Sequence, residues 1–130
     1  MKRRGYISPR IETLENYEAA FRGFAENKER RENVCRFAAN LEANLMELLV
    51  EYRDGTGHTS EYQDEEIFEP KRRIVSKLPV RDHVRQWAPL LQTERLFTDT
   101  FIRRSCSCVK GRGTHDFIHL MRKELYGDPD

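Results

Sequence analysis

The sequence lacks long hydrophobic runs, is poor in cysteine, and is without the motifs of several common enzyme families. No apolar run approaches the ~20 residues of a membrane-spanning helix, and Met1–Arg4 leads into no apolar segment typical of a signal peptide. Three cysteines, an odd count, favour reduced thiols over a disulfide framework. These absences predict a soluble, cytoplasmic protein with no membrane partner. Its 130 residues are enough for one modest core.

Motifs for catalysis and metal binding are also scarce. The patterns GxSxG, HExxH and GxGxxG do not occur. Asp128 and Asp130 lie at the C-terminus, where fraying favours solvent. The pairs Cys106-x-Cys108 and His115-x3-His119 offer four metal ligands, but their spacing is tighter than that of a zinc finger. We predict no catalytic residue and no metal site in this chain.

Acidic residues are few in the second half of the chain, although the formal net charge of the whole is only +1. Residues 1–70 carry 10 Lys or Arg against 15 Asp or Glu, whereas residues 71–130 carry 13 against 7. Between Lys71 and Arg85, six residues are basic and only Asp82 opposes them. An anionic partner is therefore expected on the second half, with an affinity that falls as salt rises.

Periodic apolar residues predict two helices in the first half, packed as a hairpin. The first begins after Thr13, a good N-cap, and places on one face Leu14, Tyr17, Phe21 and Phe24. The second carries an unbroken apolar stripe from Val34 to Tyr52 and ends at Gly55.

The second half alternates short elements with basic loops. Two extended runs that meet at Pro70–Arg72 predict a β-hairpin. A helix over 80–101 follows, which Pro89 should end or kink. After a basic loop over 103–113, Thr114 is expected to cap a last helix that closes at Gly127. The predicted fold class is α+β and mainly helical.

Two basic segments could hold phosphates. On a strand, Lys71 and Arg73 would share one face and Arg72 the other, and two cations on one face suit a triphosphate or a strand backbone. A charged edge strand that deters aggregation is the alternative. In the loop 109–114, Gly111 and Gly113 would let backbone amides approach a phosphate at a helix N-terminus. An ordinary glycine-rich loop with solvated charges is the alternative there.

The stretches EPKRRIVSKLPVRDHVRQ and FIRRSCSCVKGRGTH resemble the N-terminal fingers region of bacterial retron-type reverse transcriptases, a group that includes group II intron and diversity-generating-retroelement enzymes. The family pattern is approximately PKxRxIxxlPfRDRvvQ, then a helix, then fIxxSyAcrkGkGTH. The matching positions are Pro70, Lys71, Arg73, Val75, Leu78, Pro79, Arg81, Asp82, Val84, Gln86, Phe101, Ile102, Ser105, Cys108, Lys110, Gly111, Gly113, Thr114 and His115. Departures are Arg85 and Trp87 beside Gln86, Pro89 within the helix, and Cys106 in place of Tyr.

The resemblance implies a helical extension over 1–60 and a fingers subdomain over 61–130, with palm and thumb absent. Lys71 and Arg73 would contact the incoming deoxynucleoside triphosphate. RNA template and DNA or RNA primer would meet Arg72, Lys77, Arg81, Arg103, Arg104, Lys110, Gly111, Arg112 and Gly113. The intact polymerase would use Mg²⁺, whose palm aspartates belong to a YxDD motif that this sequence does not contain.

These features predict a fingers segment of an RNA-directed DNA polymerase that is inactive alone. Two other hypotheses stay open: a stand-alone RNA-binding module derived from such fingers, and a helical interaction domain whose basic half is only solvated surface. The sequence does not decide its oligomeric state.

Overall fold

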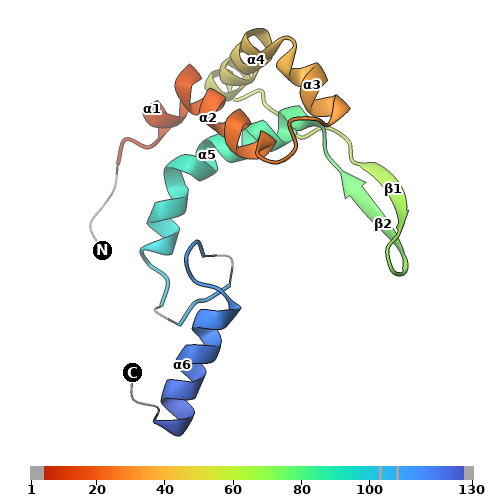
Figure 1. The fold of residues 1–130 in the computed structure, drawn as a ribbon. Coiled ribbons are helices and arrows are strands. Elements are labelled where there is room, and N and C mark those ends of the chain that lie inside the picture. Colours follow the sequence, from red (N-terminus) through yellow and green to blue (C-terminus); the bar gives the residue numbers. More distant parts are fainter. Residues whose placement is uncertain (1–4, 103, 108, 128–130) are drawn as a thin grey trace. The chain divides into compact units, whose positions relative to one another are not determined.

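The computed structural model describes residues 5–102, 104–107 and 109–127. Within them the chain is mainly helical and has one two-stranded antiparallel hairpin (Figure 1). The elements are α1 (Ser8–Ile11), α2 (Leu14–Ala25), α3 (Glu32–Ala38), α4 (Leu41–Asp54), β1 (Gln63–Phe68), β2 (Arg72–Lys77), α5 (Val80–Thr98) and α6 (Thr114–Tyr126). The predicted α+β class and the order of helices, hairpin, helix, loop and helix are confirmed. None of the helices described is long and apolar enough to cross a membrane.

The chain forms two compact units, Met1–Thr93 and Glu94–Asp130. Because the boundary falls within α5, the first unit holds α1 to α4, the hairpin and the first part of α5. The second holds the end of α5, the basic loop and α6. The sequence analysis divides the chain near residue 60 by expected function, into a helical extension and a fingers subdomain. That division stays a prediction.

The core of the first unit is built by α2, α4 and the beginning of α5. Tyr17, Leu45 and Val84 are fully buried, one from each of these helices. Burial removes the Tyr17 hydroxyl from water and, with the charge of nearby groups, raises its pKa to about 12. Phe21 of α2 also stacks on Phe37 of α3, with ring centroids 5.5 Å apart. The apolar stripes expected from the sequence thus face one another.

Two contacts tie α2 to α5. Gly23 lets the Trp87 ring approach so closely that a Cβ at position 23 would lie 2.8 Å from the ring. The buried Asn16 side chain donates to the Ala88 carbonyl at 3.0 Å and accepts from Gln92 at 2.6 Å. These contacts flank Pro89, which α5 contains without ending. Proline removes one helical hydrogen bond, and the packing on α2 holds the helix on both sides of it.

The predicted helix over 34–52 is broken in the structure at Ala39–Asn40, between α3 and α4. The apolar period continues across the break, so it gave no sign of it. At the end of α3, the Asn44 side chain donates a hydrogen bond to the Phe37 carbonyl at 2.9 Å. In an uninterrupted helix this carbonyl would accept from a backbone amide instead. The prediction of one continuous helix is therefore wrong.

Most predicted helix ends are confirmed. The Thr13 hydroxyl accepts from the Asn16 amide at 3.2 Å, and Gly55 and Gly127 end α4 and α6 in the left-handed conformation. The expected cap of α6 is wrong by one residue, because Gly113 is the N-cap and Thr114 is the first helical residue.

Candidate nucleic-acid interface

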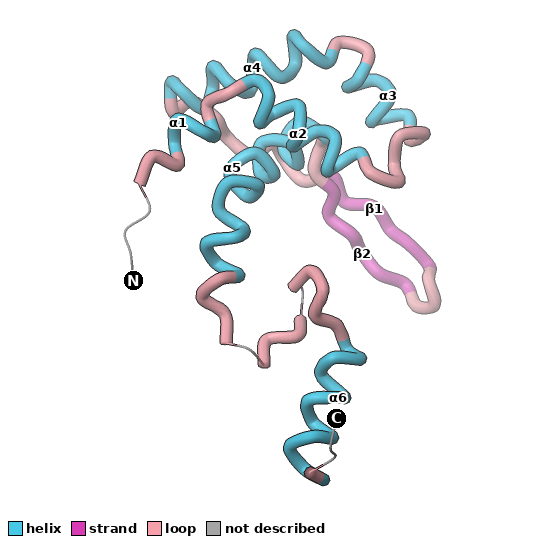
Figure 2. The backbone as a smooth tube through the Cα atoms, turned by 60° about the vertical axis from the view of Figure 1, so that its left-hand side comes forward, coloured by secondary structure: helices cyan, strands magenta, loops and turns pink. Residues whose placement is uncertain are grey.

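The hairpin places its cations differently from a simple strand alternation. Phe68 of β1 pairs with Arg72 of β2, so the connecting loop is residues 69–71 (Figure 2). Lys71 therefore lies in the loop, whereas Arg72 and Arg73 lie on β2. The turn predicted at Pro70–Arg72 begins one residue earlier, and the predicted alternation applies to Arg72 and Arg73 but not to Lys71.

The hairpin has no buried core of its own. It projects from the helices of the first unit (Figures 1 and 2), and its side chains are exposed except for half-buried Ile67 and Val75. Phe68 and Ile74, 71% and 69% exposed, lie on the same face near the tip. A two-stranded ribbon of this kind is marginally stable, so its side chains are accessible to a ligand.

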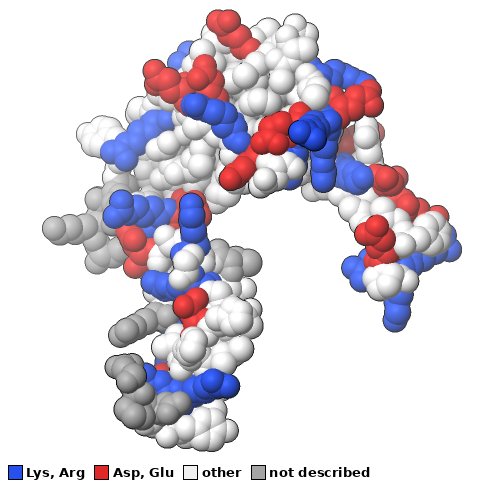
Figure 3. Space-filling view, in the orientation of Figure 1, with Lys and Arg blue, Asp and Glu red and all other residues white. Residues whose placement is uncertain are grey.

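An acidic strand faces the basic one. Residues 61–77 contain five carboxylates and four cations, and β1 carries three of the carboxylates in succession, Asp64 to Glu66. Arg72 forms an ion pair with Glu66, and Lys77 forms one with Glu65. Figure 3 accordingly shows atoms of both charges on the hairpin. The basic surface expected from residues 71–85 is thus partly neutralised by the chain itself.

Lys71 and Arg73 differ from the other two cations of the hairpin. Both are exposed, and within the described part of the chain neither forms an ion pair or a side-chain hydrogen bond. Of the four, these two retain a fully available positive charge. They are the pair expected to contact a triphosphate, and that assignment stays a prediction.

Asp82 holds the chain segment that leads into the hairpin. Its side chain is fully buried, and Oδ1 accepts the Ser60 amide at 3.1 Å while lying 3.7 Å from the Arg85 guanidinium. Arg85 in turn donates to the Thr59 hydroxyl at 2.8 Å. The first two turns of α5 therefore fix residues 59–60, three residues before β1 begins.

Arg81, an expected nucleic-acid contact, is engaged within the first unit. Its guanidinium lies 2.5 Å from Glu51 and 3.3 Å from Glu47, both on α4. Burial opposes the charge of Arg81, but the hydrogen bond and charge of Glu51, with Glu47, raise its pKa above the ordinary value. This arrangement joins α4 to α5, and an RNA contact would have to compete with both carboxylates.

In the second unit, the basic loop is closed by a tight turn. The Arg112 amide donates to the Val109 carbonyl at 3.0 Å, and Gly111 has φ = +78°, a conformation that favours glycine. Arg104 forms an ion pair with Glu124 of α6 at 2.7 Å. Lys110 at the turn is exposed. Arg103 lies outside the described residues.

The backbone amides expected to receive a phosphate are partly in use. The Gly113 amide donates to the Asp116 carboxylate at 2.7 Å, and the Arg112 amide closes the turn. The Asp116 carboxylate already stands at the N-terminus of α6, where a bound anion was expected. What the loop offers to a ligand is therefore mainly its side chains.

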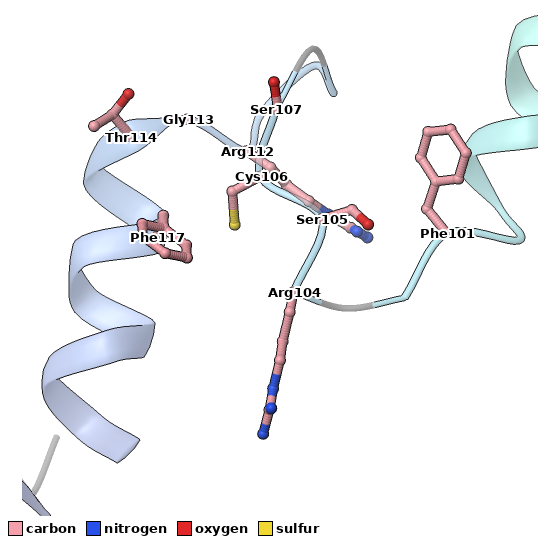
Figure 4. Close-up of a pocket in the computed structure, with 9 residues that line it drawn as sticks. All are labelled: Phe101, Arg104, Ser105, Cys106, Ser107, Arg112, Gly113, Thr114 and Phe117. Atoms are coloured by element: carbon pink, nitrogen blue, oxygen red, sulfur yellow. The ribbon is translucent and has the colours of Figure 1, made fainter. Parts of the chain in front are cut away.

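Those side chains surround a pocket of about 780 Å³ in the second unit (Figure 4). Its lining comprises Phe101, Arg104, Ser105, Cys106, Ser107, Arg112, Gly113, Thr114 and Phe117. The Arg112 side chain points toward Ser105, and its buried Nη1 has no hydrogen-bond partner among the described residues. The two phenylalanines come from opposite ends of the loop, and each is 47% exposed.

Sequence reasoning missed two parts of this interface. It gave Phe117 of the last helix no role in the interface, although this ring lines the pocket and no residue of α6 is buried. It also did not pair the acidic run Asp64–Glu66 with the basic strand, although a hairpin turn at Pro70 would have implied that pairing. Among the described residues, no group of three or more His, Cys, Asp or Glu side chains could hold a metal ion.

No protein-family model and no curated protein matches the chain. The likeness to reverse transcriptase fingers thus remains a prediction from the quoted residues.

Proposed function

We propose that this chain is the fingers segment of an RNA-directed DNA polymerase, which binds template, primer and the incoming nucleotide. The observation that carries the proposal is the pair of uncompensated cations at the hairpin tip. Lys71 and Arg73 are exposed and meet no carboxylate in the part of the chain that the structure describes, whereas Arg72 and Lys77 pair with Glu66 and Glu65. Cations left unpaired beside paired ones suit a phosphate ligand.

In this proposal the two units have different tasks. Lys71 and Arg73 contact the triphosphate of the incoming nucleotide, and the loop with Lys110 and Arg112 lies along a nucleic-acid strand. The sequence has no YxDD motif to hold the two Mg²⁺ ions of nucleotide transfer. A palm domain must therefore supply the chemistry, and the fingers supply positioning.

The test is the salt dependence with which the double variant Lys71→Ala with Arg73→Ala binds a fluorescently labelled deoxynucleoside triphosphate, measured by fluorescence anisotropy. Loss of two charged contacts should lower affinity for the triphosphate at low salt and flatten the fall of log K with log salt. The matched control is Arg30→Ala with Arg31→Ala, which removes the same charge from the exposed connection between α2 and α3.

The control should retain nearly the wild-type slope. Equal losses in both double variants would mean that only net charge matters, and they would contradict the assignment of the hairpin. A primer-extension assay adds a second check, in which the chain alone should produce no DNA.

A stand-alone RNA-binding module is the second candidate. The first unit has a closed core of its own, with Tyr17, Leu45, Leu48 and Val84 almost fully buried, which suits a module that folds without a palm. The two candidates differ in what lies downstream in the reading frame: a YxDD motif supports the polymerase, and a stop codon after Asp130 supports the module.

A further inference from the structure

We propose that the pocket of the second unit, which we call the loop pocket, binds one unpaired nucleotide of an RNA strand. The base would stack on Phe117, and its phosphate would bind Arg112 and Arg104. This inference rests on the proposed function and makes it more specific. It assigns the basic loop to single-stranded rather than double-stranded RNA.

The aromatic rings carry the first step. Phe101 and Phe117 line the loop pocket and keep about half of their surface exposed, at 47% each. In Figure 4, Phe117 projects from α6 toward the loop, and Phe101 lies on the other side of residues 104–107. A half-exposed ring in a concave site offers a face on which any base can stack.

The guanidinium groups carry the second step. Arg112 has a buried Nη1 without a hydrogen-bond acceptor in the described part of the chain, and an unmet buried donor is costly. Arg112 also lines the pocket, where a phosphate oxygen or a base carbonyl would be an acceptor for its guanidinium group. Among the described residues Arg104 pairs with Glu124, and because its side chain is largely exposed, a phosphate has to compete with this one carboxylate only weakly.

The remaining lining fits the same ligand. Ser105, Ser107 and Thr114 add side-chain hydroxyl groups beside the two cations. Rings, cations and hydroxyls together match the three parts of a nucleotide: base, phosphate and ribose. In a duplex, bases are already stacked and paired, so they cannot enter a pocket of this kind. The site therefore favours an unpaired strand.

The first experiment compares three labelled or competing probes on the full chain: a 12-residue oligouridylate, a 12-base-pair RNA duplex, and uridine monophosphate. Phe117→Leu keeps an apolar side chain but removes the π face. It should weaken oligouridylate binding about tenfold and change duplex binding less than twofold. Phe97→Leu is the matched control, because Phe97 is an exposed phenylalanine of the same unit that does not line the pocket.

A second variant tests the cation. Glu124→Gln removes the carboxylate that holds Arg104, so it should strengthen oligouridylate binding and steepen its salt dependence. This gain of affinity is not an outcome that loss of folding could produce. Unchanged or weaker binding would overturn the role of Arg104 in the pocket.

A third measurement needs no substitution. Cys106 lines the loop pocket, and Cys35 is an exposed thiol of α3 in the first unit. Alkylation rates, read by peptide mapping, should fall several-fold at Cys106 when oligouridylate is bound and stay constant at Cys35. Full protection by uridine monophosphate at the same nucleotide concentration would assign the pocket to a free nucleotide and overturn the assignment to a strand.

The outcomes separate this inference from the proposed function. If Phe117→Leu weakens oligouridylate and duplex binding equally, or leaves both unchanged while Lys71 and Arg73 still matter, the pocket does not select unpaired bases. The inference is then overturned and the proposed function stands. If wild-type protein binds neither RNA at low salt, both are overturned.

Discussion

Replacement of Asp82 should loosen the attachment of the hairpin to the helices of the first unit. Its fully buried carboxylate holds the Ser60 amide at 3.1 Å and faces Arg85 at 3.7 Å. Asp82→Ala removes both contacts, whereas Asp82→Asn keeps an oxygen for Ser60, removes the charge and adds a buried NH₂ group. The two variants thus divide the hydrogen bond from the electrostatic contribution.

The expected costs follow from what each variant leaves behind. In Asp82→Ala the half-buried Ser60 amide loses its acceptor, at about 1–3 kcal/mol, and Arg85 loses its charged neighbour, at about 0.5–1 kcal/mol at this long distance. The free energy of unfolding should therefore fall by about 1.5–4 kcal/mol. Asp82→Asn should cost about 1–2 kcal/mol, because the new amide NH₂ is buried where Oδ2 has no partner among the described residues.

Urea denaturation measures both costs. Trp87 is the sole tryptophan and packs on Gly23 in the core of the first unit, so its fluorescence follows the unfolding of that unit. Amide hydrogen exchange adds a local reading. In Asp82→Ala, exchange at Ser60 and along β1 and β2 should accelerate more than exchange in α2.

Two results would refute this reasoning. Equal destabilisation by Asp82→Ala and Asp82→Asn would mean that the charge, and not the bond to Ser60, holds the segment. A loss below about 0.5 kcal/mol in Asp82→Ala, the usual range for surface substitutions, would mean that Asp82 does not anchor residues 59–60 at all.

Two further predictions concern the core of the first unit. Gly23→Ala should destabilise the chain by about 1–2 kcal/mol, because the new Cβ meets the Trp87 ring at 2.8 Å. In a Trp87→Ala background the same change should stabilise the chain, because only the higher helix propensity of alanine remains. A loss of equal size in both backgrounds would contradict the contact. Burial, and then the charge of Lys28, lower the pKa of His83, which stacks on Phe24. The contribution of His83 to stability should therefore be complete above pH ~6.5 and decline below it, because the unfolded chain takes up the proton more readily. Between pH 7.5 and 5.5 the urea midpoint should fall less in His83→Gln than in wild type, and an identical fall would exclude this origin.

Features of the fold that depend on local chemistry could be predicted from the sequence. The Thr13 cap, the helix end at Gly55 and the turn after Phe68 all follow from side chains within a few residues of the position. The break at Ala39–Asn40 could not, because the apolar period is the same on both sides. At the break, the side chain of Asn44 takes the place of a backbone donor to the Phe37 carbonyl.

The candidate interface was predictable in its residues but not in their availability. Lys71, Arg72, Arg73 and Lys77 look alike in the sequence, and only the register of the hairpin shows which of them meet a carboxylate. The loop pocket was harder still to predict from the sequence. It requires Phe101 and Phe117, which are 16 positions apart, to line one site, and apolar residues on an amphipathic helix normally predict a core.

The acidic strand β1 supplies the hairpin with its own counterions. Any anion that reaches Arg72 or Lys77 must displace Glu66 or Glu65, which are part of the same chain and cannot diffuse away. A singly charged anion gains little from such an exchange, whereas a polyphosphate that first engages Lys71 and Arg73 can complete it. The carboxylates of β1 therefore favour ligands of high charge density over singly charged anions at Arg72 and Lys77.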